Sequence, residues 1–298
     1  MHAPIEHLPT GEQYEITVGD VTAVVTEQGA TLRSLRLGDR ELLWSFAADQ
    51  MPQASQGQQL LPWPNRIRDG RYRFDDAEHQ LPVNEVERFN ALHGLVAWLP
   101  WRLVHHTENE VEQQVRVLPQ PGYPFAVEAT LTHRVDEHGL TVEVSARNVG
   151  AGVAPWGYAA HPYVQLGGGI DEWLITSPFT SYLDVTPDRL LPIGLLPVTG
   201  TDEELDGSPL GARTFDRAFA GPTGAWELDL RSDEARVVLW AGETLPWLQI
   251  YTPDDRRSLA VEPMSCGPDA FNEGPTHAGL VRLEPGAEWQ GSWGFRVR

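Results

Sequence analysis

Apolar residues in this chain recur at every second position much more often than at helical spacing, and this alternation limits the fold more than any other feature. Successive side chains of a strand point to opposite faces, so a spacing of two predicts strands with one buried face. Residues 14–25, YEITVGDVTAVV, alternate on both sides of Gly19-Asp20 and predict a hairpin. Residues 131–144 predict a second hairpin, around Gly139.

Turn residues are spread along the whole sequence, which contains 24 prolines and 28 glycines. In NRIRDGRYRF, Asp69-Gly70 predicts a two-residue turn, because both residues accept a positive φ, and the flanking segments predict the strongest hairpin of the chain. A further turn is predicted at Pro285-Gly286, and residues 199–224 are interpreted as loop. The chain is therefore predicted to be all-β, a large antiparallel sandwich forming one domain over residues 1–298.

The charge balance limits the partners. With 22 Lys and Arg against 42 Asp and Glu, the formal net charge is −20, which repels phosphate backbones and anionic lipid. Neither nucleic acid nor a membrane is expected as a partner, and no apolar run approaches the roughly 20 residues of a membrane helix. The opening MHAPIEHLPTGEQ lacks the pattern of a secretory signal, and a single cysteine cannot form an intramolecular disulfide, so a cytoplasmic location is expected. The sequence specifies no oligomeric state.

Common cofactor and nucleophile motifs are missing. The ten histidines show none of the tight spacings of metal ligands, and Gly167-Gly168-Gly169 lacks the lysine and helix of a phosphate-binding loop. Nothing near Cys266 would lower its pKa, so it is interpreted as a buried thiol. No metal and no cofactor are expected.

Four polar residues stand in apolar or turn-like settings: Arg66 in LPWPNRIRDG, His93 in FNALHGLVAW, His161 in GYAAHPYVQL and Glu262 in LAVEPMSCGPDAFN. Burying the Glu262 carboxylate without a partner would cost several kcal/mol, so it needs hydrogen-bond donors or a chemical role. A structural pair with Arg66 would satisfy it equally well, and a lone histidine in an apolar run is more often structural than catalytic. The residues alone leave both interpretations open.

The ordered set of NRI with a following DG, then NALHG, then HPY, then VEP ahead of PDAF resembles the aldose 1-epimerase (galactose mutarotase) family, and its C-terminal part resembles a bacterial mutarotase-like subgroup. The resemblance covers nearly the whole chain. It implies a β-sandwich with a sugar cleft and no cofactor. It also implies that His161 is the general acid and Glu262 the general base, and that Arg66, His93 and Asp216 bind the sugar.

Such a pair would interconvert the α and β anomers of a hexose by opening and closing the ring. For His161 to donate a proton it must be protonated, and we expect a nearby carboxylate, Glu262 or Asp216, to hold that proton. Most of the eleven tryptophans are expected in the core. Trp63, Trp156 and Trp247 are the candidates for the cleft.

Three other functions are alternatives to epimerisation. A glycoside hydrolase needs two carboxylates flanking the scissile bond, and only Glu262 stands out, so hydrolysis is disfavoured. A non-catalytic carbohydrate-binding protein would not use an acid and a base. An epimerase for a phosphorylated or sulfonated hexose would need cations, which Arg66, Arg68, Arg71 and Arg73 supply unless they form a solvated face.

Overall fold

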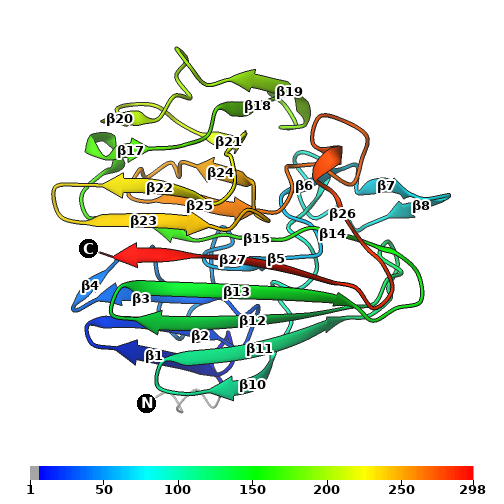
Figure 1. The fold of residues 1–298 in the computed structure, drawn as a ribbon, viewed down its shortest axis with the longest axis horizontal. Helices are drawn as coiled ribbons and strands as arrows, with labels where there is room; N and C mark the ends of the chain where they lie inside the picture. Colours follow the sequence, from blue (N-terminus) through cyan, green and yellow to red (C-terminus); the bar gives the residue numbers. More distant parts are fainter. Residues whose placement is uncertain (1–6, 298) are drawn as a thin grey trace.

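The computed structural model describes residues 7–297, and almost all of its regular structure is strand (Figure 1). In that part of the chain, 27 strands form antiparallel sheets, accompanied by two short 3-10 helices, η1 (Ile170–Glu172) and η2 (His277–Gly279). The predicted all-β antiparallel sandwich is confirmed. Residues 1–6, which begin the stretch used to disfavour a secretory signal, and Arg298 lie outside the described residues.

The largest sheet has nine strands in the order β10-β11-β12-β13-β27-β23-β22-β17-β20. Its strands are β10 (Arg102–His106), β11 (Glu110–Val117), β12 (Val127–Asp136), β13 (Gly139–Asn148), β27 (Glu288–Val297), β23 (Arg236–Ala241), β22 (Trp226–Arg231), β17 (Leu174–Thr176) and β20 (Asp206–Pro209). The red strand β27 lies in its middle, between β13 and β23 (Figure 1).

The second large sheet has eight strands; it carries Asp216 and Glu262 in its strands and His161 between two of them. Seven follow the order β19-β18-β21-β24-β25-β15-β5, and β16 also pairs with β25. They are β19 (Pro192–Pro197), β18 (Ser181–Val185), β21 (Asp216–Ala220), β24 (Trp247–Tyr251), β25 (Leu259–Met264), β15 (Ala159–Ala160), β5 (Gln59–Leu60) and β16 (Tyr163–Val164).

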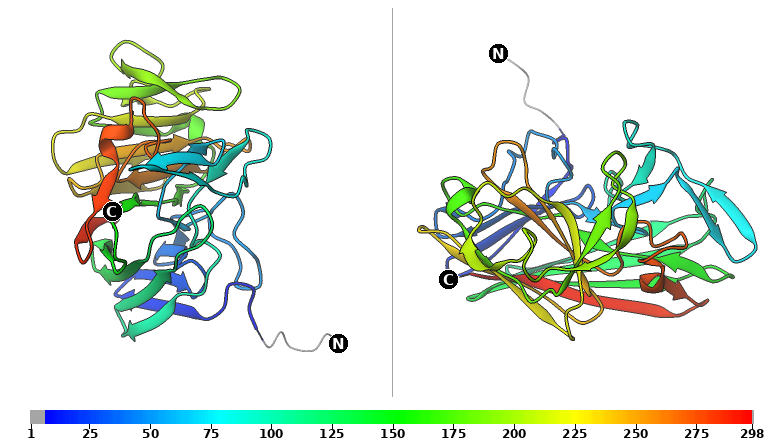
Figure 2. Two further views of the ribbon diagram at one scale, coloured as in Figure 1. Left: turned by 90° about the vertical axis from the view of Figure 1, so that its right-hand side faces the viewer. Right: turned by 90° about the horizontal axis from the view of Figure 1, so that it is seen from above.

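Smaller sheets complete the described structure. One has four strands, β1 (Gln13–Val18), β2 (Val21–Thr26), β3 (Leu32–Leu37) and β4 (Arg40–Glu41). Three pairs are β14 (Ala154–Trp156) with β26 (Val281–Leu283), β6 (Arg66–Arg68) with β9 (Asn90–Leu92), and β7 (Arg71–Phe74) with β8 (Ala77–Gln80). In the right-hand view of Figure 2, β27 and its neighbours form a lower layer, and β1–β3, β24 and β25 lie above it.

Strand β12 shows how the alternation builds the core. Its residues are buried at every second position from Val127 to Val135, and they face a single large apolar cluster that runs from Tyr14 to Val297. The exception in chemistry is His133, which is fully buried on this face with neither ring nitrogen hydrogen-bonded. Burial lowers the pKa of His133 to about 3, so the imidazole is neutral at ordinary pH.

Two of the predicted hairpins are confirmed. Strands β1 and β2 pair from Gln13 with Thr26 to Val18 with Val21, around the Gly19-Asp20 turn. Strands β12 and β13 pair along their whole length, with the turn at Glu137-His138 and Gly139 as the first paired residue of β13. In both cases the residues that alternate in the sequence are neighbours in the ladder.

The Asp69-Gly70 hairpin prediction is wrong. Both residues have the expected positive φ, 59° and 62°, but β6 pairs with β9 and β7 pairs with β8. The chain turns at Gly70, whose N–H donates to Ile67 O at 3.1 Å, and the two flanking strands then diverge. The turn residues determined the local backbone conformation, whereas tertiary contacts determined which strands β6 and β7 pair with.

The C-terminal turn and the loop interpretation also differ from the structure. Pro285-Gly286 is a turn, with Ala287 N–H donating to Glu284 O at 2.9 Å, but β26 and β27 join different sheets. Residues 199–224 contain two strands, β20 and β21. Strand β21 is central rather than peripheral, because it pairs with both β18 and β24.

Candidate active site

His161 and Glu262 face each other across neighbouring strands. Ala159 pairs with Met264 and Tyr163 pairs with Ala260, so the same antiparallel register places His161 opposite Glu262. Nε2 of His161 lies 3.3 Å from Oε1 of Glu262, and both side chains are buried. Residues directly opposite each other in a ladder share a face, which explains how two distant segments bring these groups together.

The same face continues across β24 and β21. Gln249 lies opposite Glu262, and Tyr251 lies opposite Asp216. Gln249 Nε2 donates to Asp216 Oδ1 at 2.7 Å, which fixes both side chains. Four of the residues on this face therefore come from three consecutive strands of one sheet.

Arg66 enters the site from β6, held by a buried ion pair. Its Nε donates to both carboxylate oxygens of Glu85 at 3.1 and 3.0 Å, and Nη2 donates to Oε1 at 2.9 Å. Asn65 accepts from Nη1 at 3.2 Å, and Asp216 Oδ2 lies 3.7 Å from Nη2. Burial pushes the pKa of Glu85 upward, but the hydrogen bonds and charge of Arg66 outweigh it, so the net shift is downward. Glu85 is therefore a carboxylate.

His93 reaches the cleft through an unusual backbone. Its φ is 64°, its N–H donates to Asn65 O at 2.9 Å, and its ring meets that of His161 edge-to-face at 5.3 Å between centroids. The next residue, Gly94, has φ 72°, and a Cβ there would lie 2.2 Å from Leu61 O. Only glycine fits this position, which explains the LHG sequence physically.

All five predicted site residues line one cleft of about 260 Å³. The lining consists of Ala54, Ser55, Asn65, Arg66, Arg88, Leu92, His93, His161, Tyr163, Asp216, Gln249, Tyr251 and Glu262. Among the described residues, five buried polar atoms of this lining have no hydrogen-bond partner in the protein: Nε of Arg88, Nδ1 of His93, Nδ1 of His161, Oε1 of Gln249 and Oε2 of Glu262. The cleft thus holds hydrogen-bonding capacity that the protein itself leaves unused.

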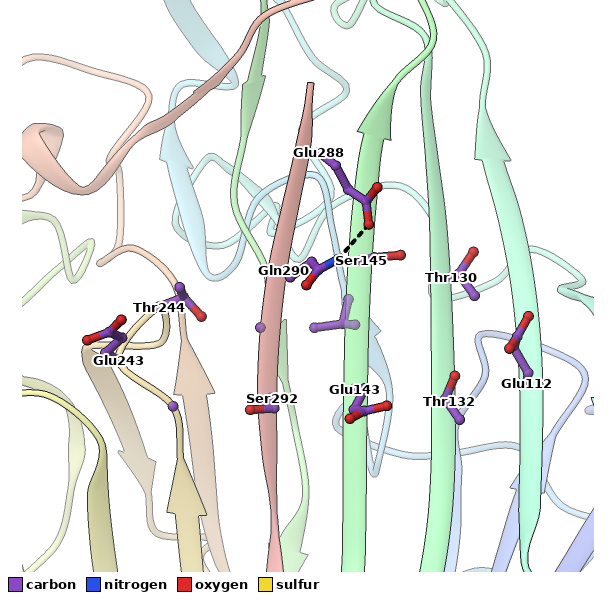
Figure 3. Close-up of a pocket in the computed structure, with 13 residues that line it drawn as sticks. Glu112, Thr130, Thr132, Glu143, Ser145, Glu243, Thr244, Glu288, Gln290 and Ser292 are labelled. Atoms are coloured by element: carbon purple, nitrogen blue, oxygen red, sulfur yellow. Dashed lines mark hydrogen bonds between the residues drawn. The ribbon is translucent and has the colours of Figure 1, made fainter. Parts of the chain in front are cut away.

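A larger groove, of about 520 Å³, lies on the face of the nine-stranded sheet (Figure 3). The labelled side chains on β11, β12, β13 and β27 are hydroxyl, amide and carboxyl groups, with Glu112, Thr132, Glu143 and Ser292 in one cross-strand row. Its lining contains no histidine and no arginine. Size alone does not identify a site of proton transfer, and the smaller cleft holds the acid–base groups.

Burial changes the proton affinities of the facing pair. It lowers the pKa of His161 to about 4, and it raises the pKa of Glu262 well above its usual range, an effect that Asp216 increases and Arg66 opposes. The free cleft therefore favours a neutral imidazole beside a protonated carboxyl group. The expectation that a carboxylate keeps His161 protonated in the free protein is wrong, because desolvation of the two groups outweighs their attraction.

The three tryptophans expected in the cleft are not there. Trp63 packs edge-to-face against Phe271, Trp156 packs against Trp289, and Trp247 is 93% removed from solvent beside Gly267. Trp247 lies on β24 two residues before Gln249, opposite Met264, and is outside the cleft lining. The aromatic residues of the lining are Tyr163 and Tyr251.

Only one of the four arginines around the Asp69-Gly70 turn lies in the cleft. Arg66 lies in the cleft, whereas Arg68, Arg71 and Arg73 line a neighbouring surface pocket. The cleft has a different second cation, Arg88, which contacts the same Glu85 at 3.3 Å. Because that carboxylate is already occupied by Arg66, Arg88 keeps donors free for another partner.

Sequence reasoning missed Glu85, Arg88, Gln249 and the two tyrosines. Gln249 had a usable signal, since an amide at the centre of the apolar strand WLQIY needs a buried polar partner. Glu85 had none, because its segment shows neither alternation nor a motif. Asp269 of PDAF has a structural role: it accepts from Arg68 N–H at 2.9 Å, and its own N–H donates to Arg66 O at 2.7 Å.

Residues 7–297 contain neither a cluster of metal ligands nor a membrane-spanning helix. No group of three or more histidine, cysteine, aspartate or glutamate side chains there is arranged to hold a metal ion. No helix in that range is long and apolar enough to cross a membrane. Cys266 is buried, and burial raises the pKa of its thiol to about 12, as expected for an unreactive cysteine.

Comparison of the chain with known proteins points in one direction. The sequence model of the family described as aldose 1-epimerase matches residues 12–296. The uncharacterized protein YihR of Escherichia coli (strain K12) is 32% identical over 285 residues, covering 93% of this chain and 90% of that protein. A galactose mutarotase of Rattus norvegicus is 28% identical over 223 residues, covering 66% of this chain and 62% of that protein.

Solved structures show the same fold. A GalM/aldose epimerase homologue from C. elegans superposes with a TM-score of 0.84 at 20% identity, covering 96% of this chain and 98% of that one. A putative aldose 1-epimerase from Escherichia coli K12 gives a TM-score of 0.81 at 20% identity, covering 96% and 99%. With the family model matched over nearly all of the described residues, the chain belongs to the aldose 1-epimerase family.

Proposed function

We propose that the protein is an aldose 1-epimerase that interconverts the α and β anomers of a hexose, with His161 and Glu262 as the proton-transfer pair. The observation that carries this proposal is the approach of Nε2 of His161 to Oε1 of Glu262, 3.3 Å apart in a cleft lined by polar groups. An acid and a base at this distance can address two neighbouring oxygens of one sugar.

The chemistry needs only one proton shuttled by two side chains. Glu262 removes the proton of the C1 hydroxyl while His161 protonates the ring oxygen, and the bond from C1 to the ring oxygen breaks to leave an open-chain aldehyde. Rotation about C1–C2 presents the other face of the aldehyde. Closure then reverses the transfers: the C5 hydroxyl returns its proton to His161, and Glu262 protonates the carbonyl oxygen.

The pair already holds the proton that this cycle needs. A neutral imidazole with a protonated carboxyl contains the same number of protons as an imidazolium with a carboxylate. Moving the proton from Glu262 to His161 when the sugar enters therefore requires no exchange with solvent. Sugar hydroxyls beside Glu262 would stabilise its carboxylate by hydrogen bonding.

The remaining lining residues suit a polyhydroxylated ring. We assign Arg66, His93 and Asp216 to binding of the sugar hydroxyls, because each presents a polar group to the cleft. Tyr163 and Tyr251 offer aromatic surface for the C–H groups of a pyranose. The single buried cysteine is compatible with our further proposal that the enzyme works in the cytoplasm.

A second candidate substrate is a hexose with a phosphate or sulfonate group, and Arg88 is the observation that favours it. Its side chain is 40% exposed, and its only carboxylate partner among the described residues is Glu85, which is shared with Arg66. Such an arginine can bind an anionic oxygen in a bidentate manner.

The test follows anomer equilibration of a panel of aldoses by NMR, with the solvent rate subtracted. His161→Ala and Glu262→Gln should each lower kcat about 10²- to 10⁴-fold, whereas exposed His105→Ala should not. Parent protein that binds a sugar without accelerating exchange would instead be a carbohydrate-binding protein. If both variants match the parent on its best substrate, the assigned roles are wrong.

Substrate charge is tested on the same panel with neutral, phosphorylated and sulfonated hexoses. Arg88→Ala should reduce kcat/KM for a charged hexose about tenfold or more and leave neutral hexoses little changed. Arg71→Ala, outside the cleft, is the matched control. A parent that prefers neutral hexoses, with no effect of Arg88→Ala, would exclude the charged substrate.

A further inference from the structure

One guanidinium joins three separate loops beside the cleft. Arg189, in the turn between β18 and β19, donates to Asp69 Oδ1 at 2.7 Å, to the carbonyl oxygens of Arg88 and Phe89 at 2.9 Å each, and to Asn90 Oδ1 at 3.2 Å. Asp69 belongs to the turn after β6, and 88–90 belong to the segment that enters β9. Four acceptors on one side chain are more than a surface arginine needs.

The loops that meet at Arg189 carry backbone conformations that side chains other than glycine rarely adopt. Asp69 has φ 59°, Phe89 has φ 55°, and Leu190, next to the arginine, has φ 56°. Such residues persist where the surrounding contacts determine the backbone. Each of the three loops contributes one of them, so the strained positions coincide with the bonds of Arg189.

Packing does little to hold the middle of this segment. Val86 is 72% exposed and Phe89 is 57% exposed, so their apolar side chains are not buried against the rest of the protein. The backbone of 85–90 closes on itself through Glu85 and Asn90, whose N–H and carbonyl groups bond reciprocally at 3.1 and 3.2 Å. Outside contacts of 88–90 are therefore mainly polar, and Arg189 supplies most of them.

The segment connects directly to the site. Asn90, which accepts from Arg189, donates through Nδ2 to Glu85 Oε2 at 2.8 Å, and Glu85 holds Arg66. Arg88 lies on the same segment and lines the cleft. An unbroken series of hydrogen bonds thus runs from Arg189 to a residue assigned to sugar binding.

We propose that Arg189 is a positioning residue that fixes the 85–90 segment as a preformed wall of the sugar cleft. It touches neither His161 nor Glu262, so it acts on binding rather than on proton transfer. The kinetic part of this proposal rests on the epimerase function proposed above. Without the hydrogen bonds of Arg189, the 85–90 segment would be mobile, and each binding sugar would have to order it at a cost in affinity.

The expected kinetic result is a split between KM and kcat. Arg189→Ala should raise KM for the best hexose about tenfold and change kcat by less than about threefold. Arg189→Lys should behave like the alanine variant, because an ammonium group keeps the charge but cannot reach four acceptors in a planar fork. A fall in kcat with unchanged KM would overturn the proposal, and so would a lysine variant with parental KM.

Arg256→Ala is the matched control. Arg256 also bridges loops, donating to Asp171 at 2.7 Å and to the carbonyl oxygens of Arg213 and Gly211 at 3.1 and 2.6 Å, but it does not line the cleft. Its loss should cost comparable stability in urea unfolding and leave KM unchanged. An equal rise of KM in both variants would show a general structural effect and would overturn the assignment.

Hydrogen exchange of the intact protein separates this proposal from the epimerase function. In Arg189→Ala, the amides of residues 85–90 should exchange about tenfold faster or more, and in Arg256→Ala they should exchange as in the parent. If the parent proves inactive but residues 85–90 still exchange faster in Arg189→Ala than in the parent, the positioning role of Arg189 is upheld and the epimerase function is rejected. If residues 85–90 exchange in Arg189→Ala as they do in the parent, the positioning role of Arg189 is rejected, whatever the activity.

Discussion

Glu85 holds the guanidinium of Arg66 through both carboxylate oxygens in an ion pair that is almost completely buried. Glu85→Gln keeps the shape but removes one charge, which leaves Arg66 buried with only the more distant Asp216 as a charged partner. We expect a loss of about 2 to 4 kcal/mol in the free energy of unfolding, measured by urea titration, together with a higher KM. Glu128→Gln, which breaks the exposed pair with Arg116, should cost less than about 1 kcal/mol.

The pH profile of kcat should be a broad plateau. Below about pH 4, His161 gains a proton while Glu262 keeps its own, so the pair has no base. Above the raised pKa of Glu262, the pair loses its last proton and has no acid. Because Asp216 helps to raise that pKa, Asp216→Asn should move the alkaline limb to lower pH. Initial rates of anomer exchange across the pH range test this, and an alkaline limb that moves upward would contradict it.

His133 makes the fold sensitive to acid. The pKa of His133 is about 3 in the folded protein against 6.5 for the free side chain, so between these values the unfolded chain binds a proton that the folded chain does not. The stability present above pH 6.5 is therefore lost progressively as the pH falls toward 3, by at most about 5 kcal/mol. His133→Leu should flatten this slope in urea titrations at several pH values. Exposed His105→Leu should leave the slope unchanged.

Gly94 permits the close approach of two backbones below His93. Gly94→Ala would place a Cβ 2.2 Å from Leu61 O as well as straining a φ of 72°, so the backbone must move. We expect a loss of more than about 2 kcal/mol and a weaker kcat/KM, since His93 would shift. Gly38→Ala separates the two effects, because Gly38 has φ 58° with no atom within 4 Å. If both variants lose the same stability, the close approach contributes nothing.

Local patterns in the sequence predicted local structure well. The hairpins at Gly19-Asp20 and Gly139 followed from alternation, because strand and partner are adjacent in the chain. The Asp69-Gly70 turn formed as predicted. Its flanking strands do not pair with each other, because β6, which carries Arg66, pairs with β9. Turn chemistry is a property of four residues, whereas a ladder depends on the whole tertiary structure.

The residues of the candidate site were likewise predictable only in part. The resemblance to a family identified five of the thirteen residues that line the cleft, although their roles stay predictions. It could not identify Glu85, which matters only because the fold places it against Arg66. Nor could composition show that Trp156 is fully buried or that burial removes the charge of His161, because both follow from solvent exclusion in the folded state.

The position of β27 has a consequence for how this chain reaches its fold. Residues 288–297 form the ladder between β13 and β23, so the two halves of the nine-stranded sheet cannot join until these residues have been synthesised. During synthesis, the edges of β13 and β23 present unpaired backbone groups to other nascent chains. We therefore expect slow, late closure and a need for protection from aggregation before it.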